Sequence, residues 1–238
     1  MFSKPARRLR LITLSLALWG ALTSLAGAQE NALELTTSSP PPAAPEAVKV
    51  DSVSNWRLVL LPFALRKPFS KPLVEGGSAY VTPAHVLTAA DIDTALDEPG
   101  DVVPISKKEY DSLNVDTATV ERLGTDYLKA LLIKQPVQYF RDRKGLVEYA
   151  AINGADPCIA SLMLLPDFYT RFEPVFGTGF RVVAPDQFTL YLFPAEGDTI
   201  NEFTRPLADQ FHDSPHPVSL EIYQFTEKGI GIVAELPR

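Results

Sequence analysis

Cysteine and histidine are scarce in this chain, with one cysteine and three histidines among 238 residues. A single cysteine excludes a disulfide-built scaffold within one monomer and any paired-cysteine metal motif. Phosphate-binding glycine loops, dinucleotide fingerprints and Gly-x-Ser-x-Gly nucleophile elbows are missing from the sequence too. The sequence therefore predicts no cofactor and none of the enzyme families that these motifs mark.

Basic residues are also outnumbered by acidic ones, since the chain has 22 lysines and arginines and 29 aspartates and glutamates. The first 28 residues hold four of the basic residues and no acidic one, so 18 basic residues face 29 acidic ones in the remainder, a net charge of −11. This balance disfavours binding to nucleic acid or to an anionic membrane surface. The 46% apolar content is that of a globular chain.

The first 28 residues have the three parts of a secretory signal peptide. A basic segment ends at Arg10, an apolar segment covers residues 11–25, and Ala26-Gly27-Ala28 is a small-residue cleavage site. The alternative is an uncleaved signal anchor, because the apolar stretch approaches the ~20 residues that cross a bilayer. We expect cleavage after Ala28, a periplasmic or secreted protein, and no stable membrane insertion afterwards.

Residues 29–54 are rich in proline, serine and threonine, as in Thr36–Pro45. Burial of so few apolar residues cannot offset the conformational entropy lost on ordering. The segment is therefore predicted to be a disordered tether. Residues 55–238 are predicted to form a single α+β domain, long enough to bury roughly 70% of its unfolded surface without a metal or a disulfide.

The first half of this domain shows one strand signal and three helix signals. A strand is expected over 56–61, stopped by Pro62. Thr82-Pro83 resembles a helix start and predicts a helix to about Leu96. The other two predicted helices are 106–113, with a Ser106-to-Glu109 capping box, and one from Asp116 to Pro136 whose apolar face carries Val120, Leu123, Tyr127 and Leu131.

The second half alternates paired strands with helices. Three hairpins are expected, at 137–152, 180–193 and 218–236. A mostly buried helix starts at Asp156-Pro157, and a helix from Thr199 should be kinked or split by Pro206. The fold class predicted from this order is α+β, an antiparallel sheet of hairpins covered on one face by helices.

Residues 101–236 resemble the YtpQ-like family of uncharacterised bacterial proteins. The similarity lies in Ala160-Ser161-Leu162-Met163-Leu164, Val182-Val183-Ala184-Pro185 and Pro217-Val218-Ser219, in that order and spacing. Members of that family follow the middle proline with an Asn-Arg-Asp-like turn, whereas this chain has Asp186-Gln187-Phe188 and no arginine there. The resemblance implies a fold and no known chemistry.

Gly76–Asp91 is similar to the segment around the catalytic histidine of chymotrypsin-like serine proteases. Asp91 stands where those enzymes have the histidine, and no Gly-Asp-Ser-Gly-Gly segment follows. The sequence therefore predicts a capped surface helix here and no protease activity.

His212 and His216, with Asp209 and Asp213 nearby, form the candidate metal site. Pro215 interrupts any helix that would place both histidines on one face, so a solvated loop is the favoured alternative.

Cys158 follows Pro157 near a predicted helix start, where the amide dipoles raise thiol reactivity. A small buried hydrophobic side chain is the favoured alternative.

Phe168, Tyr169, Phe172 and Phe176 form the candidate ligand-binding cluster. Aromatic side chains line many ligand grooves. The alternative, which we favour, is that they fill the gap between a helix and the sheet.

These observations predict a secreted, soluble, non-enzymatic module that binds an envelope protein or a small ligand. The alternative is a metal-assisted hydrolase that uses His212 and His216.

Native mass spectrometry of the protein recovered from its host's extracytoplasmic fraction tests the leader. The expected mass is that of a chain beginning at Gln29, because signal peptidase cleaves after Ala-x-Ala. A protein that retains residues 1–28 in the membrane fraction would contradict this expectation.

Overall fold

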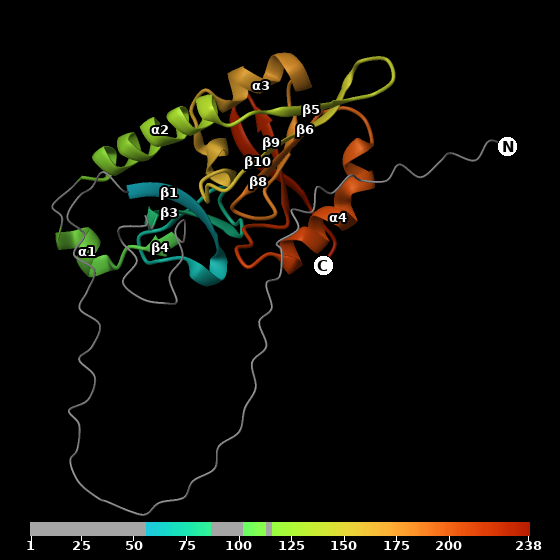
Figure 1. The fold of residues 1–238 in the computed structure, drawn as a ribbon. Coiled ribbons are helices and arrows are strands. Elements are labelled where there is room, and N and C mark those ends of the chain that lie inside the picture. Colours follow the sequence, from blue (N-terminus) through green and yellow to red (C-terminus); the bar gives the residue numbers. More distant parts are fainter. Residues whose placement is uncertain (1–55, 87–101, 113–115) are drawn as a thin grey trace, which may run out of the picture. The chain divides into compact units, whose positions relative to one another are not determined.

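The computed structural model describes residues 56–86, 102–112 and 116–238 (Figure 1). The predicted signal peptide and tether lie outside the described residues, as does Asp91. Every described residue belongs to one unit of internally contacting chain, Ala47–Arg238. None of its described helices is long and apolar enough to cross a membrane.

The smaller sheet is built from the first part of the described chain. Its strands are β1 (Trp56–Pro62), β2 (Lys71–Pro72), β3 (Ala79–Val86) and β4 (Val102–Pro104). β3 pairs with β1 along one side and with β2 and then β4 along the other, and all three pairings are antiparallel. β1 confirms the strand predicted over 56–61.

The helix predicted from Thr82 to about Leu96 is wrong over residues 82–86, because these residues belong to β3. Residues 87–96 lie outside the described residues. Thr82 and Pro83 lie inside the strand, with Pro83 opposite Leu58 of β1. On this side of β3, pairing with β2 reaches Val81 and pairing with β4 begins at Ala84, so Pro83 falls between the two partners, where a residue without an N–H is tolerated. A Thr-Pro pair suits a helix start, but the β-branched and aromatic residues around this one favour extended backbone.

The larger sheet has six strands, β5 (Gln138–Arg141), β6 (Val147–Asn153), β7 (Arg181–Val183), β8 (Thr189–Phe193), β9 (Glu221–Thr226) and β10 (Gly229–Glu235). Their order is β10-β9-β7-β8-β6-β5, antiparallel throughout. The three predicted hairpins are therefore confirmed, as β5–β6, β7–β8 and β9–β10.

Four α-helices are described, α1 (Lys107–Ser112), α2 (Thr117–Lys134), α3 (Phe168–Phe176) and α4 (Thr199–Asp213). α2 begins as predicted, because the Asp116 carboxylate accepts a hydrogen bond from the Thr119 N–H at 2.6 Å. The segment after Asp156 is buried as predicted but forms a 3₁₀ helix, η3 (Ala160–Leu164). α4 continues through Pro206 and is not split.

Helices cover both faces of the larger sheet. Val183 and Phe193 point toward Ile200 and Leu207 of α4, whereas their neighbours Val182 and Leu192 belong to the main core. That core joins the sheet to β1, α2, η3 and α3, and Figure 1 shows α2 and α4 on opposite sides of the strands. The α+β class and the antiparallel sheet of hairpins are confirmed. Helices cover both faces of this sheet and not one face as predicted, because α4 packs on the face opposite the main core, and the structure adds a second sheet.

Gly124 lets α2 approach β1 closely. This contact predicts that the effect of Gly124→Ala on stability changes sign when Leu58 is shortened. A Cβ at this position would lie 2.4 Å from Leu58 Cγ. Gly124→Ala should therefore destabilise the protein by about 1–3 kcal/mol, although alanine is the better helix former.

The same substitution in a Leu58→Ala background should stabilise the protein by up to about 0.5–1 kcal/mol, because the contacts with Leu58 Cγ at 2.4 Å and Cδ1 at 2.8 Å are removed and only the Cβ contact at 3.2 Å remains. Urea unfolding of the parent protein, the two single variants and the double variant gives a double-mutant cycle. The same loss in both backgrounds would contradict the predicted contact.

Candidate functional site

A cleft of about 900 Å³ opens where the two sheets end. β2 is an outermost strand of the smaller sheet and β10 is an outermost strand of the larger one. Both strands line the cleft, together with part of α2, the segment from η3 into α3, and the β9–β10 turn. A volume of this size lies within the range of small-ligand sites.

The floor of the cleft is apolar. It is formed by side chains from both sheets and from η3, namely Leu58, Leu73, Val81, Met163, Leu165, Phe225 and Ile230. Phe225 is only 3% exposed and its ring lies 5.0 Å from that of Phe168, so the floor rests directly on the aromatic core. Apolar groups of a ligand would be desolvated there.

Charged and hydroxyl side chains surround this floor. Lys71 of β2 forms an ion pair of 2.8 Å with Glu121 of α2. Glu173 of α3 and Glu227 of the β9–β10 turn also line the cleft, and within the described chain neither has a basic side chain within 4.0 Å. The rim therefore carries two carboxylates without an ion-pair partner in the described chain.

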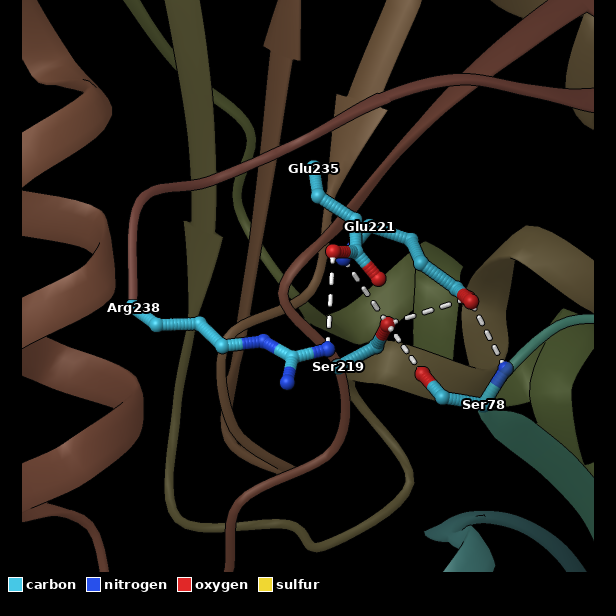
Figure 2. Close-up of polar contacts among 5 residues, drawn as sticks. All are labelled: Ser78, Ser219, Glu221, Glu235 and Arg238. Carbon is cyan, nitrogen blue, oxygen red and sulfur yellow. Dashed lines mark hydrogen bonds and ion pairs between the residues drawn. The ribbon is translucent and has the colours of Figure 1, made fainter.

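A buried carboxylate joins the two sheets beside the cleft (Figure 2). Glu221 of β9 is 4% exposed and accepts three hydrogen bonds. The Ser78 N–H donates at 2.7 Å to one carboxylate oxygen, and the hydroxyls of Ser219 and Tyr223 donate to the other at 3.1 and 2.6 Å. We call Ser78, Ser219, Glu221 and Tyr223 the carboxylate joint.

The joint fixes the position of the β2–β3 loop on the larger sheet. Burial, followed by the hydrogen bond to Glu221, raises the pKa of Tyr223, so its hydroxyl remains a proton donor. Gly77 sits against β10, because a Cβ there would lie 3.0 Å from the end of Ile232. Leu73 of the cleft lies on the same β2–β3 loop, so the joint ties this part of the cleft to the larger sheet.

The sequence analysis missed the joint, although its pattern was visible. Ser219, Glu221 and Tyr223 alternate along one predicted strand, which places three polar groups on one face. The partner Ser78 is 141 residues away from Ser219 and could not be assigned from spacing.

The four predicted aromatic residues separate into two groups. Phe168, Phe172 and Phe176 are at most 4% exposed and belong to the core, where they fill the space between α3 and the sheet. Tyr169 is half-buried and lines the cleft. Among the predicted four, Tyr169 alone therefore reaches the candidate site directly.

The two predicted metal ligands lie at and just beyond the end of α4. His212 lines a small hollow with Asp209 and Arg238, and Arg238 also approaches Glu235 at 3.8 Å (Figure 2). His216 packs edge-on against Phe188. The described residues contain no group of three side chains suited to hold a metal ion.

Cys158 is fully buried beside Asp156. Burial and then the neighbouring carboxylate raise the pKa of the thiol well above its usual range. Tyr127 donates a hydrogen bond to the same carboxylate, and the Arg57 guanidinium lies 3.7 Å from the centre of the Tyr127 ring. These contacts favour the inert interpretation of the cysteine.

A second polar network lies under α4. Gln210 donates to Asp186 at 2.7 Å and to Thr189 at 3.1 Å, and it accepts from the Tyr191 hydroxyl at 3.1 Å. Burial, together with the nearby Asp186, raises the pKa of Tyr191 to about 12. The segment after Pro185 thus holds α4 on the sheet.

Comparison of the chain with protein-family models, with curated proteins and with solved structures gives no match. The resemblance of residues 101–236 to the YtpQ-like family stays a prediction.

Tyr223→Phe tests the carboxylate joint. Removing the hydroxyl takes one of three donors from a buried carboxylate, and we expect a loss of about 1.5–3 kcal/mol in the free energy of unfolding. Tyr139→Phe is the matched control, since Tyr139 is 40% exposed and its change should stay within about 0.5 kcal/mol. Equal midpoints of urea unfolding for the two variants would contradict the joint.

Cys158 should be unreactive in the folded protein. Because the thiol is fully buried and its pKa is raised, we expect the disulfide reagent DTNB at pH 8 to release no thiolate before unfolding. The same protein in urea should release one equivalent, since the chain has one cysteine. Stoichiometric reaction of the folded protein within seconds would show the prediction to be wrong.

Proposed function

We propose that this protein is a non-enzymatic binding module of the bacterial cell envelope and that the cleft between β2 and β10 holds its ligand. The observation that carries the proposal is the combination of an apolar floor and a charged rim in a cleft of about 900 Å³. Sites of this kind gain affinity from desolvating the floor and orientation from a few polar groups at the rim.

The way the cleft is built supports a binding role. Its floor rests on buried aromatic rings, and the carboxylate joint fixes the β2–β3 loop, which carries Leu73 of the cleft, to β9. A preorganised site loses little free energy to ordering when a ligand arrives. The hydrolase alternative with His212 and His216 rests on the sequence alone, and no structural observation favours it.

Titration with the neutral fluorescent probe N-phenyl-1-naphthylamine tests the proposal. The probe should bind the processed protein saturably, with enhanced emission, because the apolar floor excludes water. Thr125→Trp places a large side chain at the cleft wall on α2 and should weaken binding at least tenfold.

Lys129→Trp is the matched control, since Lys129 is exposed on the same helix and does not line the cleft. It should bind the probe as the parent protein does. Loss of binding in both variants, or no saturable binding in the parent, would overturn the proposal.

A further inference from the structure

The sheet edges and the charge of the cleft together identify the class of its ligand. We propose that the cleft binds a peptide segment in extended conformation, carrying basic side chains, that pairs with the free edge of β10. This inference rests on the proposed function and specifies its ligand. It is derived from three independent features of the described residues.

The first feature is the free edge of β10. β10 pairs only with β9 in the described sheet, so every second amide and carbonyl along it points away from its partner. Gly229 and Ile230 of this strand line the cleft. An extended peptide placed there would satisfy those backbone groups, as in other cases of strand addition.

The second feature limits the pairing to the cleft end of β10. The register with β9 is regular from Gly229 to Ile232 and then shifts by one residue at a bulge. Bulges interrupt a ladder and bend the strand away. Across the cleft, β2 has two residues and one of them, Pro72, has no N–H, so β10 is the better template of the two edges.

The third feature is the charge of the rim. Glu173 and Glu227 line the cleft without an ion pair in the described chain, and Lys71 is already held by Glu121. A ligand with basic groups would therefore gain two ion pairs, whereas an acidic ligand would face like charge. Alternation of apolar and basic side chains along an extended peptide matches an apolar floor below an acidic rim.

Fluorescence anisotropy with two labelled peptides tests the inference on the processed, full-length protein. The peptides are rhodamine-labelled Lys-Val-Lys-Val-Lys-Val and its counterpart with glutamate in place of lysine. We expect the basic peptide to bind at least tenfold more tightly at low salt, with the difference shrinking as salt is added.

Two changes separate the charge contribution from the strand contribution. Glu173→Gln combined with Glu227→Gln should weaken the basic peptide about threefold to tenfold, because two exposed ion pairs are lost. The matched control is Glu196→Gln with Glu202→Gln, two exposed glutamates outside the cleft, and it should leave binding unchanged. N-methylation of alternate peptide amides should weaken binding at least tenfold, because it blocks ladder hydrogen bonds.

The outcomes also separate this inference from the proposed function. Equal binding of the two peptides, equal effects of the two glutamine pairs, or full affinity of the N-methylated peptide would overturn the inference. If N-phenyl-1-naphthylamine binds the cleft and the basic peptide neither binds nor displaces it, the inference fails and the binding proposal stands. If neither the probe nor the peptide binds, both fail.

Discussion

The arrangement of the two sheets depends on a carboxylate that has been taken out of water. An ionised carboxyl group buried without partners costs several kcal/mol, and Glu221 avoids that cost only through donors from more than one segment of the chain. One of these donors, the Ser78 N–H, belongs to the loop that leads into β3. Separating the sheets would leave the carboxylate short of a donor, so the interaction ties together two elements 143 residues apart.

This constraint holds the β2–β3 loop, which carries Leu73 of the cleft, on the larger sheet, because the Ser78 N–H donates to Glu221 of β9. In the same loop, Gly77 lies against β10, since a Cβ at this position would lie 3.0 Å from Ile232 Cδ1. On the far side, Gly124 brings α2 against Leu58, which lies on the floor of the cleft. Two glycines at close approaches and one buried carboxylate thus hold elements that carry residues of the cleft.

The features that the sequence predicts correctly are those set by neighbouring residues. The Asp116 cap and the three hairpins depend on a few residues at fixed offsets. The pairing of β7 with β9 is not encoded locally, and the same holds for the second sheet. Thr82-Pro83 shows why local signals also fail, because the pair suits a helix start or a strand and only the distant partner β1 decides. The candidate site divides in the same way: aromatic spacing identified Tyr169, but neither Glu173 on the same helix nor Glu227 of the β9–β10 turn.

The two free edges of the larger sheet differ in a way that bears on binding. β5 is four residues long, is exposed along its length and has a register shift beside Phe140, and neither β5 nor β6 lines the cleft. β10 also has an unpaired edge in the described sheet, and Gly229 and Ile230 of its regular segment line the cleft with its apolar floor. Backbone hydrogen bonds to an open edge contribute little binding free energy in water, because solvent competes for the same groups. They select one peptide over another only where contacts of its side chains accompany them. An edge strand next to an apolar floor is therefore the place where main-chain pairing adds to the affinity for a peptide. The acidic rim then favours peptides whose side chains are positively charged.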